Sequence, residues 1–336
     1  MRRRDLPTEF HAAAPVRLDF AGGWTDLPPF SAREGGVVVN AAIRLYAHVT
    51  LQLGGKLLRL VSEQSGESLE CVNSGGLVPD GKLTLLKAGL RMFPVLGNFT
   101  LTTRSDVPAG SGLGDSGALD VALVAALTRA REERLSAGEL AEQAWYLEVM
   151  EAQIPGGRQD QLAAAFGGFH RFTFRDPDVG IEPLTLDPAF AAALERQTLL
   201  CCTGRSQLSG DAIGRVMSAY ERGDRAVTGA LRAMKDVAER TVEALRAGDL
   251  VRVGALVAKQ WTHQQALDPA MRNDNVTRLE RAMAGAGALG GKGAGAGMGC
   301  AMFFLVPDRD AAAAAATAAG AAVLPVVWAP EGARAW

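Results

Sequence analysis

The sequence predicts an α+β protein made of two domains. Its 336 residues are about twice the usual length of one domain, and 48% of them are hydrophobic, which is ample for a buried core. In the first half, strand patterns come first and helical patterns follow, which favours an α+β layer over regular βαβ winding. The second half ends in a strand, a helix and a final strand behind a glycine-rich segment, as in half of a split β-α-β arrangement. We therefore expect domains over residues 1–180 and 181–336.

Three strand patterns and two helical patterns fill the first half. Apolar alternation and apolar runs predict strands over residues 15–20, 35–53 and 99–103. Leucine and alanine at helical spacing predict a helix over 116–133. Ser136 with Glu139 three residues later forms a capping box, so a second helix should begin there and continue to about residue 150. The first domain is therefore expected to pack helices against a sheet.

The second half of the chain is mostly helical. Pro, Asp and Gly punctuate residues 176–187, which indicates a domain edge. Beyond it the pattern predicts a strand over 198–203, helices over 211–246, 249–267 and 275–283, a strand over 301–306, an alanine-rich helix from 311 and a last strand over 323–328. The sequence contains no internal repeat.

Charge and hydropathy exclude several classes of protein. Lys and Arg number 35 against 37 Asp and Glu, so the net charge of -2 leaves no basic face for a nucleic-acid duplex. The longest apolar stretch, residues 311–328, is mostly alanine and contains Gly320 and Pro325, so it is too weakly hydrophobic to span a bilayer. The basic N-terminus lacks the apolar core of a secretory signal. We expect a cytoplasmic protein that binds neither nucleic acid nor membrane.

Cysteine and histidine give no sign of a structural metal site. The four cysteines are Cys71, Cys201, Cys202 and Cys300, and no two have the spacing of a zinc knuckle. The four histidines likewise lack metal-ligand spacing. Cys201 and Cys202 lie in an apolar run, so we expect one or both of them to pack as small hydrophobes, in a reducing compartment.

Glycine is the unusual residue, with 39 copies, and three glycine-rich segments carry the functional signal. Residues 108–118 follow a predicted strand and open a predicted helix. Glycine permits positive φ and lets backbone N–H groups converge, and the helix start adds its positive dipole end, so a phosphate is the expected occupant. Ser116 in the first helical turn can reach a magnesium ion or a phosphate oxygen. A tight connection is the simpler interpretation, but four glycines in eight residues exceed what it needs.

Two familiar nucleotide motifs do not account for the glycine. The P-loop pattern fails at residues 286–293, because Ala286 replaces its first glycine and Gly293 replaces its Ser or Thr. The dinucleotide pattern occurs at 285–290 but follows a predicted helix rather than a strand. An NAD-dependent enzyme is therefore not expected.

The other two glycine-rich segments have the composition of a substrate site. Residues 15–26 place a cation, an aromatic ring, a hydroxyl and a carboxylate just past a strand end, a mixture that suits a sugar. Trp24 could equally cap a core. Residues 290–299 form a backbone almost free of side chains, which could approach a phosphate or substrate closely or form a close-packed hairpin.

In order and spacing, these three segments resemble the signature motifs of the GHMP superfamily, which contains galactokinase, homoserine kinase, mevalonate kinase and phosphomevalonate kinase. Further matches lie at residues 156–161, 165–169, 203–206 and 287–292. The resemblance therefore covers nearly the whole chain. Within the superfamily, residues 22–29 with 35–38 are similar to the branch of sugar kinases that contains D-glycero-D-manno-heptose 7-phosphate kinase and L-fucokinase.

The resemblance implies an N-terminal domain like ribosomal protein S5 domain 2 and a ferredoxin-like C-terminal domain, with ATP and substrate meeting between them. It assigns to the ATP phosphates the residues Pro108, Gly110, Ser111, Gly112, Leu113, Gly114, Asp115 and Ser116. It assigns Mg²⁺ to Ser116 and Glu148, with Glu151 as second choice for the carboxylate. It assigns to the substrate the residues Trp24, Thr25, Asp26, Gly157, Gln161 and Gly295. Asp160 matches the active-site aspartate and Arg17 the arginine of the first motif.

The predicted activity is ATP-dependent phosphorylation of an anomeric sugar hydroxyl. Asp160 would orient or deprotonate that hydroxyl, and Arg17 would keep the carboxylate ionised. D-glycero-D-manno-heptose 7-phosphate is the preferred substrate, and L-fucose or a related monosaccharide is the alternative. The candidate cations for a substrate phosphate are Arg104, Arg158, Arg205 and Lys292. A non-catalytic sugar or nucleotide sensor is the alternative from another class, and the prediction is compatible with a homodimer.

One departure from the family pattern concerns Asp115, where family members usually carry a small hydroxyl residue. A carboxylate beside the phosphates would either repel them or give magnesium an additional oxygen ligand. We favour the ligand.

Overall fold

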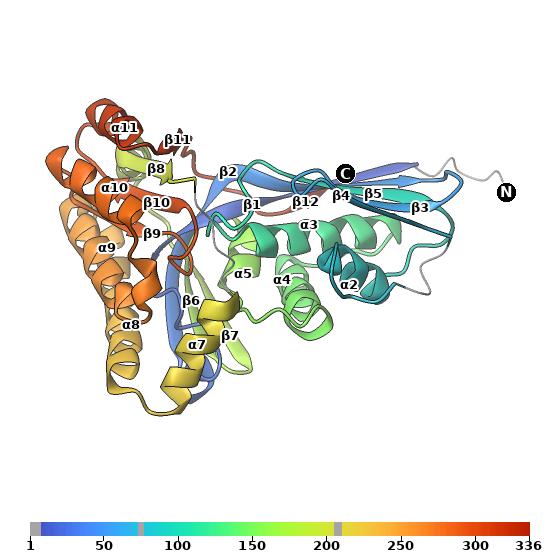
Figure 1. The fold of residues 1–336 in the computed structure, drawn as a ribbon, viewed down its shortest axis with the longest axis horizontal. Coiled ribbons are helices and arrows are strands. Elements are labelled where there is room, and N and C mark those ends of the chain that lie inside the picture. Colours follow the sequence, from blue (N-terminus) through green and yellow to red (C-terminus); the bar gives the residue numbers. More distant parts are fainter. Residues whose placement is uncertain (1–7, 73–76, 205–209) are drawn as a thin grey trace.

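The fold is described from a computed structural model, which describes residues 8–72, 77–204 and 210–336. A large sheet with helices beneath it forms the N-terminal domain, and a smaller sheet with its own helices forms the C-terminal domain beside it (Figure 1). The predicted α+β organisation in two domains is confirmed.

The large sheet has eight strands. They are β1 (Glu9–Ala21), β2 (Gly36–Leu53), β3 (Leu58–Ser62), β4 (Glu67–Cys71), β5 (Phe99–Ser105), β6 (Phe169–Arg175), β7 (Asp178–Pro183) and β12 (Arg334–Ala335). The order β12-β1-β2-β5-β3-β4 is antiparallel except for the parallel pair β3 and β5. Strand β2 is long enough to pair with β6 over its first part and with β5 over its last. This double pairing carries the sheet toward the second domain.

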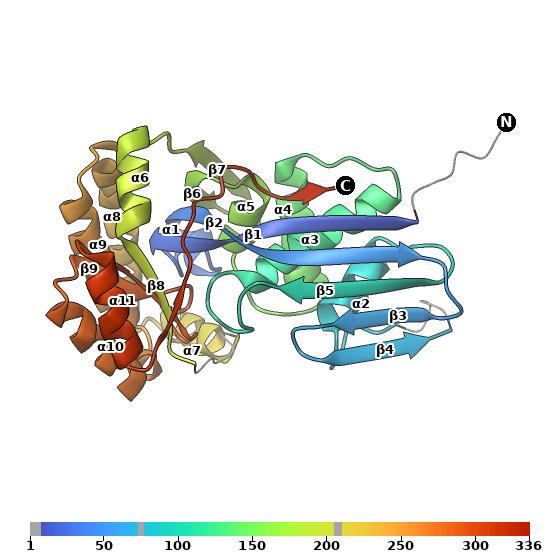
Figure 2. The same ribbon diagram turned by 90° about the horizontal axis from the view of Figure 1, so that it is seen from above.

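Helices cover one face of this sheet, while Figure 2 shows the strands from the other face, with the helices behind them. The elements on the covered face are α2 (Thr84–Met92), α3 (Asp115–Ala130), α4 (Ala137–Tyr146), the π-helix η2 (Leu147–Glu151) and α5 (Gln159–Phe166). The predicted capping box is present, since the Ser136 side chain accepts from Glu139 N and the Glu139 carboxylate accepts from Ser136 N. The short helix α1 (Phe30–Glu34) lies between β1 and β2 along the chain.

The C-terminal domain is built on a four-stranded antiparallel sheet in the order β11-β8-β10-β9. Its strands are β8 (Thr198–Cys202), β9 (Gly290–Gly293), β10 (Ala301–Leu305) and β11 (Ala322–Leu324). Its helices are α6 (Pro188–Gln197), α7 (Gly210–Glu221), α8 (Arg225–Arg246), α9 (Leu250–Gln265), the 3-10 turn η3 (Pro269–Met271), α10 (Asp274–Gly285) and α11 (Arg309–Ala318). The helix predicted over 211–246 is in fact two helices, because Gly223 adopts a φ of 76° and Asp224 caps α8.

The division between the domains differs from the predicted one. A border at residue 180 would cut β7, which pairs with β6 in the large sheet. Strand β7 is largely exposed, so it carries few apolar residues and its sequence looks like a linker. The end of the chain also returns to the large sheet, where β12 pairs with β1 and Trp328 bridges Ile43.

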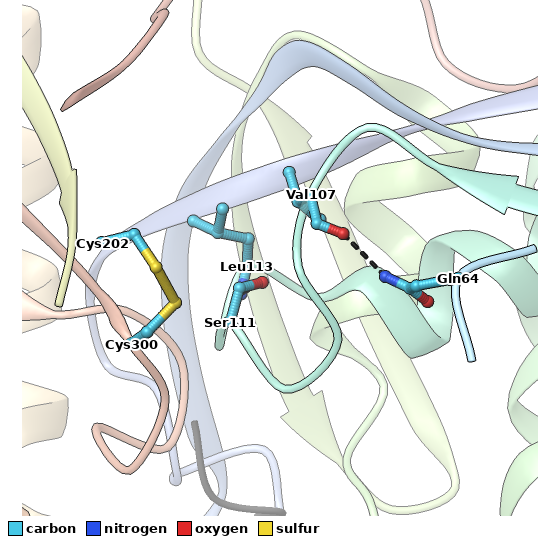
Figure 3. Close-up of a disulfide and its surroundings, with 6 residues drawn as sticks. All are labelled: Gln64, Val107, Ser111, Leu113, Cys202 and Cys300. Carbon is cyan, nitrogen blue, oxygen red and sulfur yellow. Dashed lines mark hydrogen bonds between the residues drawn. A yellow bond between two sulfur atoms is a disulfide. The ribbon is translucent and has the colours of Figure 1, made fainter. Parts of the chain in front are cut away.

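The neighbouring strands β8 and β10 bring two cysteines together. Cys202 forms a disulfide with Cys300, with their Cα atoms 4.8 Å apart, so of the two adjacent cysteines only Cys201 packs as a free small hydrophobe. Cys201 is buried and free as expected, and burial raises its thiol pKa to about 12. Figure 3 shows the disulfide close to Ser111 and Leu113 of the second glycine-rich segment. Within the part of the chain that the structure describes, no helix has the length and apolarity to cross a membrane.

Candidate active site

A cavity of about 590 Å³ lies where the two domains meet. Its walls come from the end of β1 and the turn after it, the loop between β5 and α3, the start of α5, and the loop after β9. All three glycine-rich segments therefore converge on one space, although residues 15–26 and 290–299 are far apart in the sequence.

The loop between β5 and α3 depends on its glycines. Gly110, Gly112 and Gly114 have φ values of 66°, 89° and 77°, a region that other residues rarely adopt. A Cβ on Gly112 would lie 2.6 Å from the carbonyl oxygen of Ala294, so the loop packs directly on the third glycine-rich segment. Gly114 is the N-cap of α3, which leaves the first N–H groups of that helix free to bind an anion.

Three of the predicted loop residues, Pro108, Ser111 and Leu113, belong to the structure of the loop itself. Pro108 is exposed at the start of the loop, and Leu113 is fully buried in the core, so neither side chain faces the cavity. The carbonyl oxygen of Leu113 accepts a hydrogen bond from Arg17 N at 2.9 Å, which ties the loop to β1. The buried Ser111 hydroxyl accepts from Leu113 N at 3.3 Å. The loop is thus fixed before any ligand arrives.

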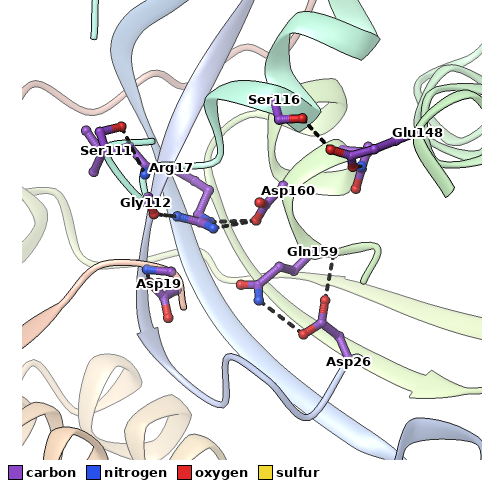
Figure 4. A network of polar contacts seen from close by, with 12 residues as sticks. Arg17, Asp19, Asp26, Ser111, Gly112, Ser116, Glu148, Gln159 and Asp160 are labelled. Carbon is purple, nitrogen blue, oxygen red and sulfur yellow. Dashed lines mark hydrogen bonds and ion pairs between the residues drawn. The ribbon is translucent and has the colours of Figure 1, made fainter. Parts of the chain in front are cut away.

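Arg17 and Asp160 form the central charged pair (Figure 4). Arg17 Nε donates to Asp160 Oδ1 at 2.8 Å, Nη2 lies 2.6 Å from the same oxygen, and Nη1 donates to the carbonyl oxygen of Gly112. Burial opposes the charged form of Arg17, but the carboxylates of Asp160 and Asp19 outweigh it and raise the pKa of the guanidinium. Arg17 is 3% exposed and Asp160 29% exposed, so the carboxylate is the member of the pair that a substrate can reach.

Asp160 owes its position to a close helix contact that the sequence did not reveal. It stands in the first turn of α5, which packs against the start of α3. A Cβ on Gly117 would lie 2.7 Å from the Cβ of Asp160, so only glycine lets the two helix ends approach this closely. Gly117 therefore shapes the active site without lining it.

Ser116 and Glu148 come together as predicted. The Ser116 hydroxyl donates to Glu148 Oε1, and Gln161 Nε2 donates to the other carboxylate oxygen at 2.6 Å. Burial raises the pKa of Glu148 to about 7, against the opposing effect of the Ser116 hydrogen bond and with a contribution from Asp160. One hydroxyl and one carboxylate beside a phosphate loop fit Mg²⁺, which takes one or two protein oxygens and completes its shell with phosphates and water. The alternative ligand Glu151 pairs instead with Arg91 at 3.6 Å.

Asp26 occupies the opposite wall of the cavity. Its Oδ1 accepts from Gln159 Nε2 at 3.1 Å and its Oδ2 from Gln159 N at 3.2 Å. Burial, together with the charge of Asp160, raises the pKa of Asp26 to about 6. A Cβ on Gly157 would overlap the Asp26 carboxylate, so the backbone wraps tightly around that group. The family resemblance assigned Asp26 and Gly157 to the substrate and gave no role to Gln159.

Trp24 and Gly295 also line the cavity, whereas Thr25 and Gln161 do not. Trp24 packs in the core of the C-terminal domain, and its buried Nε1 has no partner among the described residues. The Thr25 hydroxyl is fully buried and bonded to the backbone of Gly22 and Val37, so it holds the turn and is withdrawn as a sugar ligand. Gln161 is withdrawn on the same ground, because its side chain is buried against Glu148.

Asp115 lines the cavity but is held by neutral groups. Its carboxylate accepts from the Ser105 hydroxyl and from Gln64 Nε2 at 3.2 Å. Burial raises its pKa, and the hydrogen bonds from Ser105 and Gln64 oppose that rise. Gln64 comes from the turn between β3 and β4, which no pattern in the sequence linked to the phosphate loop.

The candidate cations for a substrate phosphate lie in different places and have different partners. Lys292 is fully buried, with Nζ 2.6 Å from Asp19 Oδ2, so it is not a phosphate ligand. Arg104 is exposed and pairs with Asp106. Arg158 lies 4.1 Å from the centre of the Trp145 ring and donates to the carbonyl oxygen of Pro177. Arg205 lies outside the described residues.

Comparison with known proteins agrees with this geometry. Two family models match, GHMP kinases N terminal domain over residues 83–168 and GHMP kinases C terminal over residues 241–325. D-glycero-alpha-D-manno-heptose 7-phosphate kinase of Campylobacter jejuni is 33% identical over 302 residues, covering 87% of this chain and 88% of that protein. The chain belongs to the GHMP kinase family. GHMP kinases use ATP as the phosphate donor, and this GHMP kinase is an ATP-dependent sugar kinase.

Further relatives of this GHMP kinase agree. The bifunctional fucokinase/GDP-fucose pyrophosphorylase of Arabidopsis thaliana is 27% identical over 81% of the chain, which spans 28% of that longer protein. A solved D-glycero-D-manno-heptose 1-phosphate kinase from Bacteroides thetaiotaomicron superposes with a TM-score of 0.79 at 27% identity, covering 97% of this chain and 98% of that one. Lactococcus lactis galactokinase, 18% identical over 97% of this chain and 95% of its own, shares the fold with a TM-score of 0.76.

Proposed function

We propose that this GHMP kinase phosphorylates the anomeric hydroxyl of a sugar, with D-glycero-D-manno-heptose 7-phosphate as the first candidate. The relative in Campylobacter jejuni whose name states that substrate supports this choice, since the similarity extends over most of both chains. The observation that carries the proposal is the position of Asp160, held by Arg17 beside the phosphate loop and open to the cavity.

The proposed mechanism follows from this arrangement. The glycine loop and the start of α3 bind the ATP phosphates through backbone N–H groups. Asp160 orients the sugar hydroxyl and accepts its proton as the phosphoryl group is transferred. Arg17 holds the Asp160 carboxylate in place and offsets negative charge in the transition state. Asp26 and Trp24 hold the sugar on the opposite wall.

Magnesium has a suitable donor set in Ser116 and Glu148. When bound, Mg²⁺ would neutralise charge on the ATP phosphates. Gln161 orients Glu148 for this task by donating to the carboxylate oxygen that Ser116 does not contact. The reaction consumes ATP, which is in keeping with a cytoplasmic location.

An unphosphorylated sugar such as L-fucose is the second candidate, and one observation favours it. Within residues 8–72, 77–204 and 210–336, Arg17 is the one cationic side chain that lines the cavity, and it is already paired with Asp160. A heptose phosphate would need a further cation for its own phosphate.

The test is a measurement of ADP release by the purified protein with ATP, Mg²⁺ and a panel of D-glycero-D-manno-heptose 7-phosphate, L-fucose, galactose and arabinose. We expect the highest kcat/KM with the heptose 7-phosphate. Preference for L-fucose would support the second candidate. Tight ATP binding with no turnover of any sugar would contradict the proposal and favour a sensor.

A further inference from the structure

The side chain of Gln159 is the most unusual polar group in the cavity. It is 8% exposed, it lines the cavity, and it stands directly before Asp160 at the start of α5. The family resemblance assigned it no role, and the mechanism above does not use it.

Gln159 fixes the geometry of Asp26 with two donors. Its backbone N–H binds Oδ2 and its side-chain Nε2 binds Oδ1, so the carboxylate is held at both oxygens by one residue. In Figure 4 the Gln159 carboxamide lies between Asp26 and Asp160. The amide nitrogen must face Asp26, because the amide oxygen would be repelled by a carboxylate. The orientation of the amide is thereby settled by chemistry.

This orientation leaves the amide oxygen without a donor. Gln159 Oε1 is buried and has no hydrogen-bond partner among the described residues. A buried acceptor that stays unpaired is costly, so a ligand that brings a donor is favoured. Trp24 also lines the cavity, and its Nε1 is a buried donor without a partner among the described residues. Two residues of the cavity wall therefore each carry a buried, unpaired polar atom, an acceptor in Gln159 and a donor in Trp24.

We propose that Gln159 is a specificity-determining residue whose Oε1 accepts a hydrogen bond from the sugar hydroxyl on the carbon next to the one that is phosphorylated. This inference rests on the proposed function. Gln159 and Asp160 are consecutive, so groups that they bind lie close together. When Asp160 binds the anomeric hydroxyl, Gln159 Oε1 accepts a hydrogen bond from the 2-hydroxyl. A sugar that lacks this hydroxyl leaves Oε1 unpaired in the closed site.

The experiment compares the preferred sugar with its 2-deoxy analogue, in the wild-type protein and in Gln159→Met. Wild-type kcat/KM should fall between about fivefold and 150-fold for the 2-deoxy sugar, the range expected when a buried acceptor loses its partner. Gln159→Met also loosens Asp26, so its activity falls with both sugars. The kcat/KM values of this variant for the two sugars should nevertheless differ by no more than about twofold.

Gln161→Met is the matched control. Gln161 is on the same helix, is buried even more deeply (1% exposed against 8%), and also has an unpaired Oε1, but it contacts Glu148 and does not line the cavity. It should lose activity with both sugars and keep the wild-type ratio. If Gln159→Met keeps the wild-type ratio as well, the inference is wrong.

Sugar binding measured by calorimetry separates this inference from the proposed function. A protein that binds the sugar more tightly than the 2-deoxy sugar, and loses that preference in Gln159→Met, supports the role of Gln159 even without turnover. A protein that binds no sugar overturns both. A protein that phosphorylates sugars but binds both forms equally overturns only the inference.

Discussion

Two charged pairs begin at Arg17 and Asp19 of β1 and serve different purposes. Arg17 and Asp19 are two residues apart, so their side chains leave the same face of the strand. Arg17 pairs with Asp160, which is 29% exposed and faces the cavity. Asp19 pairs with Lys292, and both are fully buried. One pair is therefore available to chemistry, while the other is sealed between the domains.

The buried pair, Asp19 with Lys292, holds in place the part of the cavity wall that packs against Arg17. Asp19 Oδ1 accepts from Gly295 N at 2.9 Å, and Lys292 Nζ also donates to the Asp19 carbonyl oxygen. Gly295 in turn lies against Gly112 and Arg17, where a side chain would not fit. Burial lowers the pKa of Lys292, although Asp19 opposes this. The contrast shows that two cation–carboxylate pairs that begin on one strand can act in catalysis or in domain assembly, depending on what covers them.

Replacing Asp160 by Asn should have the largest effect on activity. The amide cannot take the proton of the sugar hydroxyl, and it removes the carboxylate that pairs with Arg17. We expect kcat to fall between about 10²- and 10⁴-fold, the usual contribution of a general base. Steady-state ADP release with the preferred sugar measures it. A kcat within threefold of the wild type would show that Asp160 has no role in proton transfer.

Breaking the buried pair should instead lower stability. Lys292→Met leaves the Asp19 carboxylate buried and unpaired, which should reduce the free energy of unfolding by about 3–5 kcal/mol. Urea denaturation measures the loss. Lys56→Met, at an exposed lysine, should change it by less than about 0.5 kcal/mol. The double variant Asp19→Asn with Lys292→Met should recover part of the loss; equal losses in Lys292→Met and Lys56→Met would remove the distinction between the two charged pairs.

The charged pair that faces the cavity, Arg17 with Asp160, was predictable from the sequence, and the buried pair was not. Glycines at positive φ leave a local signal, so the phosphate loop and Ser116 were found from residues 108–118 alone. Family resemblance then placed Arg17 and Asp160. Lys292 was one of four candidate cations for a substrate phosphate. Its burial was not predictable, because its partner Asp19 is 273 residues away and no local pattern shows that a lysine will be buried.

Other errors have the same physical origin. Thr25 looks like a sugar ligand by composition, but its hydroxyl is used by the backbone of its own turn. Gln159 and Gln161 have the same side chain two residues apart, and only the packing of α5 decides which of them faces the cavity. Residues 176–187, which contain β7, indicated a domain edge because an exposed edge strand needs few apolar residues. Long-range packing decided each case.

A change of pH should alter sugar binding through the ionisation of Asp26. The folded pKa of Asp26, about 6, lies above the ordinary value of 3.8, so the stability tied to its protonation is present below pH 3.8 and is lost as pH rises through 6. Sugar binding follows the opposite sign, because only the ionised carboxylate accepts from both Gln159 and sugar hydroxyls. The sugar Kd, measured by calorimetry without ATP or metal, should rise roughly tenfold between pH 7 and pH 5.

Asp26→Asn is the control for this titration. Its sugar Kd should be higher at pH 7 and should change little between pH 7 and pH 5, since position 26 no longer ionises. A wild-type Kd that stays constant over this interval would show that Asp26 does not bind the sugar in its ionised form.

The smallest effect is expected at Asp115, a carboxylate that resembles neither pair because its partners Ser105 and Gln64 are neutral. Both partners donate, so lone pairs remain on the carboxylate for a magnesium ion beside the phosphate loop. Asp115→Ser should raise the half-saturating Mg²⁺ concentration by up to about fivefold, because a partly exposed charge contributes up to about 1 kcal/mol. Titration of ADP release with Mg²⁺ at saturating ATP measures it. Tighter ATP binding in this variant, without a greater need for Mg²⁺, would mean that Asp115 repels the phosphates and is not a magnesium ligand.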